Sequence, residues 1–355
     1  MKINSLQSLR FIMALMIFHH HFFYEPNYVQ IVQFGTFPVT FFFILSGFMM
    51  SLGYAEKVEA GNFDYRKYLC KRLVRICPLN LICLALILLV PLITDIYHAD
   101  FYLMIKRLAS VVPSVLLIQS WIPIQKIYFS GNAAAWFLSD ILFCYVAFPW
   151  LIRLCTNKHK LIRFLIVLIL YFCLVITIPY DYVHKFVYIN PLFRIVDFVI
   201  GIEMYILFRK LSQRSVKASF LTKTVVELLV CLFAVAAMLI SPLVPIRFSY
   251  VSLFWIPSAA IILIFALYAK SGGGISCILS QKILVYLGTL SFTFYMLHMI
   301  IRNWYNLIES EYLGEDFREI GAILCVSILL LMSHIYAKFF EPYIVKKLSC
   351  LYEKS

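Results

Sequence analysis

Long apolar stretches alternate with short polar and basic segments along the whole sequence. Each apolar stretch is close to the roughly 20 residues that an α-helix needs to cross the hydrocarbon core of a bilayer. The pattern therefore predicts an all-α integral membrane protein. We predict about ten transmembrane helices, at residues 7–24, 34–55, 76–95, 132–152, 161–179, 189–208, 224–241, 249–268, 283–305 and 318–340.

Residues 96–131 do not fit this pattern. They include the apolar run SVVPSVLLIQSWIP, but Pro113 and Pro123 interrupt it. Counting a span here would also move the basic stretch 153–163 to the outer side of the membrane. We therefore expect an outward-facing amphipathic or re-entrant segment, because irregular backbone at membrane depth is tolerated where protein buries it.

The composition agrees with a chain that is mostly embedded in lipid. Hydrophobic residues make up 63% of it and charged residues only 14%, whereas a soluble domain is nearer half apolar and a quarter charged. No polar run is long enough to build a separate soluble core. We expect one transmembrane domain over residues 1–345, followed by a short cytoplasmic tail at 346–355.

The net charge of +13 is distributed in a way that argues against nucleic acid as a partner. Most basic residues lie in short segments between apolar spans, as the positive-inside rule requires of a protein in a lipid bilayer. With the N-terminus inside, both termini are cytoplasmic and the plasma membrane is the expected location. The predicted inner segments are the N-terminus through Arg10, residues 56–75, 153–163, 209–223 and 269–282, and the C-terminal tail.

The first predicted span carries Arg10 and, eleven residues later, His21. Eleven residues are almost three helical turns, so both side chains share one face, about 16 Å apart along the axis. Ionisable residues inside a bilayer are costly and are functional candidates for that reason. His21 could act as a general base on a hydroxyl group. The structural alternatives are a histidine hydrogen-bonded to a neighbouring helix and an arginine that anchors the span.

The run His19, His20 and His21 also raises the question of a metal site. Consecutive helical residues point about 100° apart, whereas pairs of helical ligands favour spacings of three or four residues. We predict no metal site. The ten cysteines are scattered and form no CxxC pair, so we expect them to pack among apolar side chains.

Other candidates occur beside or within later spans. Arg72 and Arg75 share one helical face and could fork onto phosphate oxygens, although such residues also anchor spans at the inner surface. Ser46 and Gly47 allow either close helix packing or a local break that exposes backbone donors.

The remaining polar residues fall in the fourth, sixth and ninth spans. Trp136 lies at the outer end of the fourth span, where Asp140 follows. Arg194 and Asp197 are three residues apart and are expected to neutralise each other. His298, in the ninth span, is the second histidine with a claim to function.

Several of these residues and motifs occur together in one protein family, and the chain resembles this family, acyltransferase family 3. The resemblance rests on Arg10 and His21 with ten residues between them, FFFILSGF (41–48), KRLVRICP (71–78), AWFLS with Tyr145 and Pro149, RIVDFVIGI (194–202) and LGTLSFTFYMLH (287–298). It implies that Arg10 and His21 form an essential pair and that Arg72 and Arg75 are functional. Many members have a glutamate where this chain has Ile141, and Asp140 is not its equivalent.

The resemblance implies an O-acetyltransferase that uses acetyl-CoA as co-substrate and a carbohydrate as acceptor. We expect the phosphates of acetyl-CoA at the inner basic residues Arg10, Arg72 and Arg75, with Ser46, Gly47, Trp136 and His298 in possible supporting roles. The acceptor would approach from the outer side, and His21 would take its proton. The alternative is a glycan or lipid-linked sugar transporter, which would also need buried charges. No inverted repeat or matched pair of broken helices is visible for it.

Overall fold

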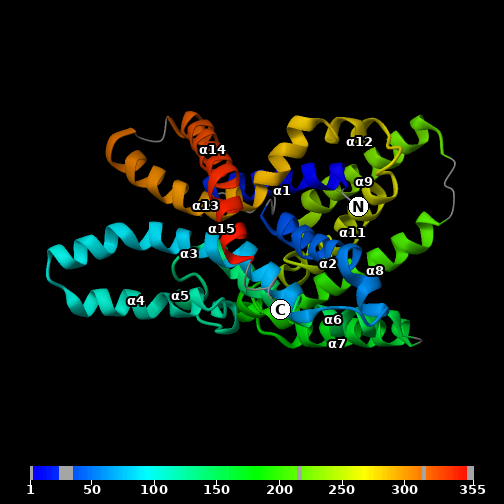
Figure 1. Cartoon of the computed structure of the whole chain (residues 1–355), viewed down its shortest axis with the longest axis horizontal. Coiled ribbons are helices and arrows are strands. Elements are labelled where there is room, and N and C mark those ends of the chain that lie inside the picture. The colour runs from blue at the N-terminus through cyan, green and yellow to red at the C-terminus, as the bar shows by residue number, and fades with distance from the viewer. Residues whose placement is uncertain (1–2, 24–34, 158, 214–217, 314–316, 350–355) are drawn as a thin grey trace. The chain divides into compact units, whose positions relative to one another are not determined.

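The computed structural model describes residues 3–23, 35–157, 159–213, 218–313 and 317–349, and within these ranges it contains helices and no strand (Figure 1). The long helices are α1 (Asn4–Phe23), α2 (Thr36–Glu59), α3 (Tyr65–Tyr97), α6 (Trp136–Thr156), α7 (Lys160–Thr177), α8 (Pro191–Ser212), α9 (Phe220–Ile240), α13 (Lys282–Ile308) and α14 (Arg318–Ile335). The shorter α-helices are α4 (Phe101–Val115), α5 (Gln125–Tyr128), α10 (Ile246–Ser249), α11 (Trp255–Leu267), α12 (Gly274–Leu279) and α15 (Glu341–Leu348). Two brief 3-10 turns that matter below are η1 (Gln119–Trp121) and η2 (Ala133–Ala135).

Nine of the ten predicted spans overlap one of the long helices, and the predicted span at 249–268 overlaps the shorter α11. Within the described ranges, six helical stretches are long and apolar enough to cross a membrane, or seven if the pair 161–177 and 180–188, bent by 119°, counts as one span. The chain is therefore a multi-pass helical membrane protein. Ten crossings and two cytoplasmic termini stay predictions.

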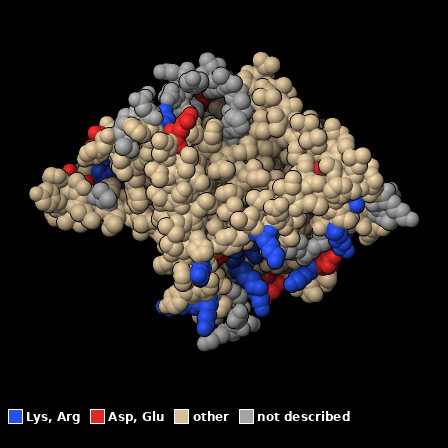
Figure 2. Space-filling view, turned by 90° about the horizontal axis from the view of Figure 1, so that it is seen from above, with Lys and Arg blue, Asp and Glu red and all other residues tan. Residues whose placement is uncertain are grey.

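The charged side chains leave much of the surface free. In Figure 2, lysines and arginines gather toward one edge of the view, while broad areas carry neither acidic nor basic groups. The most apolar stretch of α2 is 72% buried by protein, whereas that of the span beginning with α9 is only 28% buried. Exposed apolar surface of this extent is costly in water and suits contact with lipid.

The chain forms two compact units, each assembled from separate parts of the sequence. The first contains Met1–His20, Tyr24–Phe63 and Phe143–Thr289, and the second contains His21–Phe23, Asp64–Leu142 and Leu290–Ser355. Helix α1 therefore contributes to both units. The prediction of one domain over residues 1–345 stays a prediction.

In the first unit, α2 and α8 approach each other through glycines. A Cβ atom added to Gly47 would lie 2.0 Å from the carbonyl oxygen of Phe198, and one added to Gly201 would lie 2.0 Å from that of Ile44. Small residues let helix backbones pack this closely in membrane proteins. The two helices thus make a tight contact at the centre of the unit.

The same unit buries the ion pair expected within α8. Arg194 Nη1 lies 3.0 Å from Asp197 Oδ2, and both side chains are fully buried. The indole N–H of Trp255 donates to Asp197 Oδ1, and the Arg194 guanidinium lies 4.5 Å from the centre of the Phe43 ring. These contacts confirm that the two charges neutralise each other.

In the second unit, residues 96–131, expected from the sequence to be amphipathic or re-entrant, are largely helical. Helix α3 runs on to Tyr97, and α4 then folds back beside it (Figure 1). The Asp100 side chain caps α4 by accepting from Leu103 N, and Arg107 Nε donates to Asp95 at 2.8 Å. The amphipathic helix α4 occupies much of residues 96–131, and the membrane side that it faces stays a prediction.

Candidate functional site

The second unit brings His21 beside His298. The last turn of α1 carries His21, which is half-buried, and the middle of α13 carries His298, which is 1% exposed. Their ring centres are 5.3 Å apart with the planes tilted by 30°. Phe22, next to His21, packs on Tyr305 of the same helix with ring centres 5.1 Å apart. The two strongest histidine candidates from the sequence thus lie side by side.

The other two histidines of the run have different surroundings. His19 is exposed. In the first unit, the ring of His20 packs so closely on Gly35 that an added Cβ there would lie 2.5 Å from His20 Cδ2. The direction of each side chain around α1 therefore separates His21 from its neighbours, as the 100° step between helical residues requires.

One hydrogen bond fixes the tautomer of His298. Its Nδ1 lies within hydrogen-bonding distance of the carbonyl oxygen of Tyr295, one turn earlier on α13. A carbonyl oxygen can only accept, so Nδ1 carries the proton and Nε2 carries the lone pair. Nε2 is buried and has no hydrogen-bond partner within the described ranges. His298 therefore presents an acceptor nitrogen beside His21.

Polar contacts from the segment before α6 hold this turn of α13. The hydroxyl of Tyr295 donates to the carbonyl of Ala134 at 2.8 Å, and the Asn132 amide donates to the carbonyl of Met296 at 2.8 Å. Phe137 packs edge-on against Tyr295, with ring centres 5.8 Å apart. Trp136, a supporting candidate, is buried and makes an edge-on contact with Phe137 at 6.4 Å. The ring of Phe137 thus lies between Trp136 and the turn of α13 that carries Tyr295 and His298.

Sequence reasoning did not identify Tyr295, Asn132 or Arg302 as part of this region. Arg302 is half-buried and follows His298 by four residues, so both lie on one face of α13. The spacing of Tyr295, His298 and Arg302 was the available signal, since the three residues fall on successive turns. Nothing in the sequence near Asn132 indicates its bond to a helix so distant in the chain.

Arg10 lies in the part of α1 that belongs to the first unit. It is half-buried, and its Nη1 lies 3.5 Å from the Gln7 side-chain oxygen. Because α1 is a continuous helix between Arg10 and His21, the expected rise of about 16 Å applies.

Arg72 and Arg75 lie on α3 in the second unit. Arg75 Nη1 forms a 3.1 Å ion pair with Glu341 of α15, and both side chains remain partly exposed. Arg72 is half-buried, with a buried Nε atom. The pairing of Glu341 with Arg75 could not be predicted, because the sequence does not show which distant segment α3 contacts.

The contacts of Ser46 and Gly47 serve the structure of α2 and its packing. The hydroxyl of Ser46 donates to the carbonyl of Phe42, one turn earlier in α2, at 2.7 Å. Helix α2 runs unbroken through both residues, so the local break considered from the sequence is not seen. Close packing against α8 accounts for Gly47.

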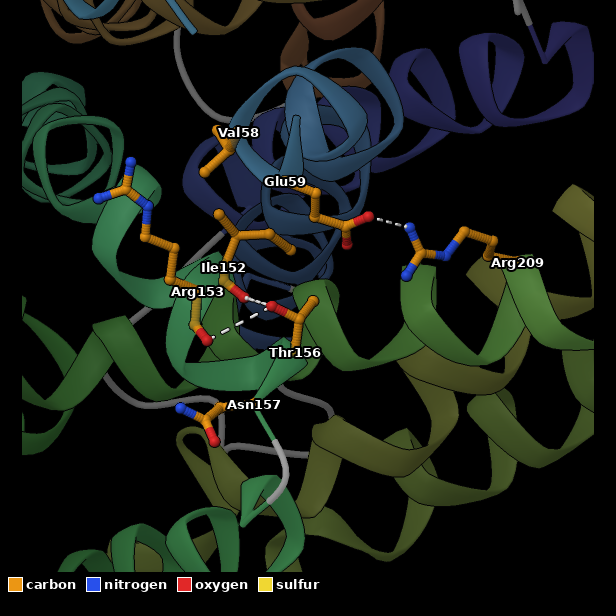
Figure 3. A pocket seen from close by; sticks show the side chains of 7 residues that line it. All are labelled: Val58, Glu59, Ile152, Arg153, Thr156, Asn157 and Arg209. Carbon is orange, nitrogen blue, oxygen red and sulfur yellow. Dashed lines mark hydrogen bonds and ion pairs between the residues drawn. The ribbon is translucent and has the colours of Figure 1, made fainter. Parts of the chain in front are cut away.

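A pocket of about 530 Å³ opens in the first unit, and its lining contains none of the predicted site residues (Figure 3). Glu59 and Arg209 form a 2.7 Å ion pair on one side of it, and Arg153 extends to the other side of the view. The Thr156 hydroxyl is occupied by carbonyls of its own helix. The pocket therefore offers Arg153 as an exposed cation at an end of α6 predicted to face the cytoplasm.

Comparison with known proteins gives two matches. A family model described as "Acyltransferase domain", that of acyltransferase family 3, matches residues 3–337. Acyltransferase MdmB from Streptomyces mycarofaciens is 27% identical over 347 residues, covering 87% of this chain and 82% of that protein. No solved structure matches. The two matches support membrane acyl transfer as the class of activity.

Proposed function

Since the chain belongs to acyltransferase family 3, we propose that it moves an acetyl group from cytoplasmic acetyl-CoA to a hydroxyl group of a cell-surface or lipid-linked carbohydrate. The plasma membrane is the proposed location. The observation that carries the proposal is the contact between His21 and His298 in the second unit. A titratable side chain placed beside a buried, tautomer-fixed imidazole is suited to proton transfer.

In the proposed reaction, His21 acts as the general base. It takes the proton of the acceptor hydroxyl as the oxygen attacks the carbonyl carbon of the thioester. The new C–O bond forms, the C–S bond breaks, and the departing CoA sulfur takes a proton from the His21 imidazolium. The products are the acetyl ester and free CoA. A route through an acetyl-histidine would need the same residue.

The basic residues of the inner surface would bind the nucleotide end of acetyl-CoA. Arg10 is separated from His21 by about 16 Å of helix, a span that the extended pantetheine arm can cover. Arg72 and Arg75 offer guanidinium groups that match phosphate geometry. Along α1, the phosphates would then lie toward Arg10 and the thioester toward His21.

Replacing His21 with asparagine tests the proposal. We expect His21→Asn to lower transfer of radiolabelled acetyl from acetyl-CoA to envelope glycans by about 100-fold or more, the usual contribution of a general base. The measurement uses purified full-length protein in proteoliposomes supplied with glycans from cells that lack it. His19→Asn is the matched control, because His19 belongs to the same run but is exposed.

Full transfer by His21→Asn would overturn the assignment of the base. Movement of a glycan across the membrane with no acetyl incorporated, by the unaltered protein, would favour a transporter instead.

A further inference from the structure

Gln119 is a buried side chain in η1 whose hydrogen-bonding capacity is half used. It is 0% exposed, and its amide nitrogen donates to the carbonyl of Ala135 at 2.8 Å. Its amide oxygen Oε1 is buried and meets no hydrogen-bond donor within the described part of the chain. The amide cannot be turned around, because Oε1 would then face the carbonyl oxygen of Ala135.

Gln119 bonds to the same short turn, η2, as Tyr295, whose carbonyl orients His298. Within η2, the carbonyl of Ala134 accepts from the Tyr295 hydroxyl, and the carbonyl of Ala135 accepts from Gln119, both at 2.8 Å. Tyr295 in turn accepts the Nδ1–H of His298 through its own carbonyl. Two neighbouring carbonyls of η2 therefore tie Gln119 to the turn of α13 that carries His298, all within the second unit.

The two groups share one chemical property, since each presents a buried atom that can only accept a hydrogen bond. These atoms are Gln119 Oε1 and His298 Nε2. Leaving such an atom without a donor is unfavourable, so a ligand that supplies donors gains from binding there. The hydroxyl groups of a sugar supply such donors, whereas phosphate oxygens and a thioester carbonyl do not. The amide N–H groups of the pantetheine arm are donors as well, so KM for acetyl-CoA must be measured beside KM for the sugar.

We propose that Gln119 and His298 form a binding subsite for hydroxyl groups of a neutral polyhydroxylated acceptor. The inference rests on the proposed function and adds the acceptor side of it. Gln119 lies in the segment 96–131, which the charge distribution predicts to face outward, whereas the basic residues proposed for acetyl-CoA lie in segments predicted to face the cytoplasm.

The test replaces Gln119 with methionine, which keeps the length and apolar stem but removes the amide. Full-length protein in proteoliposomes is given labelled acetyl-CoA and a panel of methyl hexopyranosides with their mono-deoxy counterparts. We expect Gln119→Met to raise KM for the glycoside by about tenfold, the effect of one lost hydrogen bond. KM for acetyl-CoA should stay unchanged.

Ser120→Ala is the matched control. Ser120 is the next residue of η1, is equally buried, and loses a hydrogen bond to Ser139 when truncated. It should leave both KM values unchanged. With the unaltered protein, KM should be about tenfold higher for the mono-deoxy glycoside that lacks the hydroxyl bound by Gln119. This deoxy penalty should vanish in Gln119→Met.

The possible failures are distinguishable. If Gln119→Met and Ser120→Ala give the same KM for the glycoside, or if the deoxy penalty persists in Gln119→Met, the subsite is overturned while the role of His21 stands. If the unaltered protein acetylates envelope glycans but none of the neutral glycosides, the neutral-polyol class is overturned. If it transfers acetyl to nothing, the proposed function itself fails.

Discussion

At the scale of single residues, the orientation of one imidazole determines what the centre of the second unit can bind. The carbonyl of Tyr295 fixes the His298 proton on Nδ1, so Nε2 can only accept. Every residue within a helix has a backbone carbonyl one turn before it. His298 bonds to this carbonyl because its ring is buried and few other polar groups are within its reach.

Two substitutions at His298 separate the roles of its nitrogens. His298→Asn can still donate near the Nδ1 position, but its side chain is too short to place an acceptor at the Nε2 position. The longer side chain of His298→Gln can place an acceptor there. We expect His298→Asn to lower kcat/KM for the acceptor by about 10- to 100-fold and His298→Gln to lower it less, since one hydrogen bond is retained. Acetyl-transfer kinetics measure the difference, with Tm in detergent as the check on folding. Equal losses in the two variants would contradict the acceptor role of Nε2.

At the scale of elements, α15 interferes with the expected use of α3. Glu341 bonds to Arg75, one of three arginines predicted to hold the phosphates of acetyl-CoA. The pair is partly exposed, so it contributes at most about 1 kcal/mol and a phosphate can displace it. Glu341 also lies beyond residue 337, where the family match ends.

Removing the Glu341 charge should free Arg75. We expect Glu341→Gln to tighten acetyl-CoA binding by about two- to fivefold, because the ligand no longer breaks an ion pair. Arg75→Gln should weaken binding by about tenfold, since a charge-assisted hydrogen bond is lost. Equilibrium binding of labelled acetyl-CoA to the solubilised full chain measures both.

Arg153→Gln is the matched control for Arg75→Gln, as it removes an exposed cation that lines the pocket of the first unit. It should leave binding unchanged. Equal weakening by Arg153→Gln and Arg75→Gln would replace the proposed phosphate contact with a general effect of surface charge.

The elements differ in how far the sequence predicts them. The long helices follow from apolar length alone, and the Arg194–Asp197 pair follows from its spacing within one helix. Gln119 and Asn132 could not be predicted, because each bonds to a backbone carbonyl of another segment and any residue supplies a carbonyl. The contact between His21 and His298 depends on which helices become neighbours, which periodicity does not reveal.

At the scale of the whole molecule, the number of membrane crossings is the main question for the reaction. The proposed path needs acetyl-CoA and the acceptor to reach the protein from opposite sides. Helix length and composition support six or seven crossings within the described ranges, whereas the apolar stretches of the sequence predict about ten. The division into two units also could not be read from the sequence, since each unit combines separate segments.

Cysteine labelling in intact cells distinguishes these topologies. Cys173 and Cys277 are exposed and must first be replaced. With ten spans, Lys126→Cys and Asp181→Cys should react with a membrane-impermeant maleimide added outside, and Ser271→Cys should react only after the cells are opened. Labelling of Ser271→Cys from outside, or protection of Asp181→Cys, would contradict the ten-span arrangement.

The ion pair inside α8 has a consequence for how the protein is made. Arg194 and Asp197 belong to one helix, so they can meet as soon as that helix forms. A lone arginine or aspartate at the centre of an inserting helix costs about 2.5–3.5 kcal/mol on insertion scales. A pair that is neutral within its own segment reduces this cost before α2 is in place. Helix α8 can therefore leave the translocation machinery for the lipid early, and its docking against the glycines of α2 becomes a later, separate event.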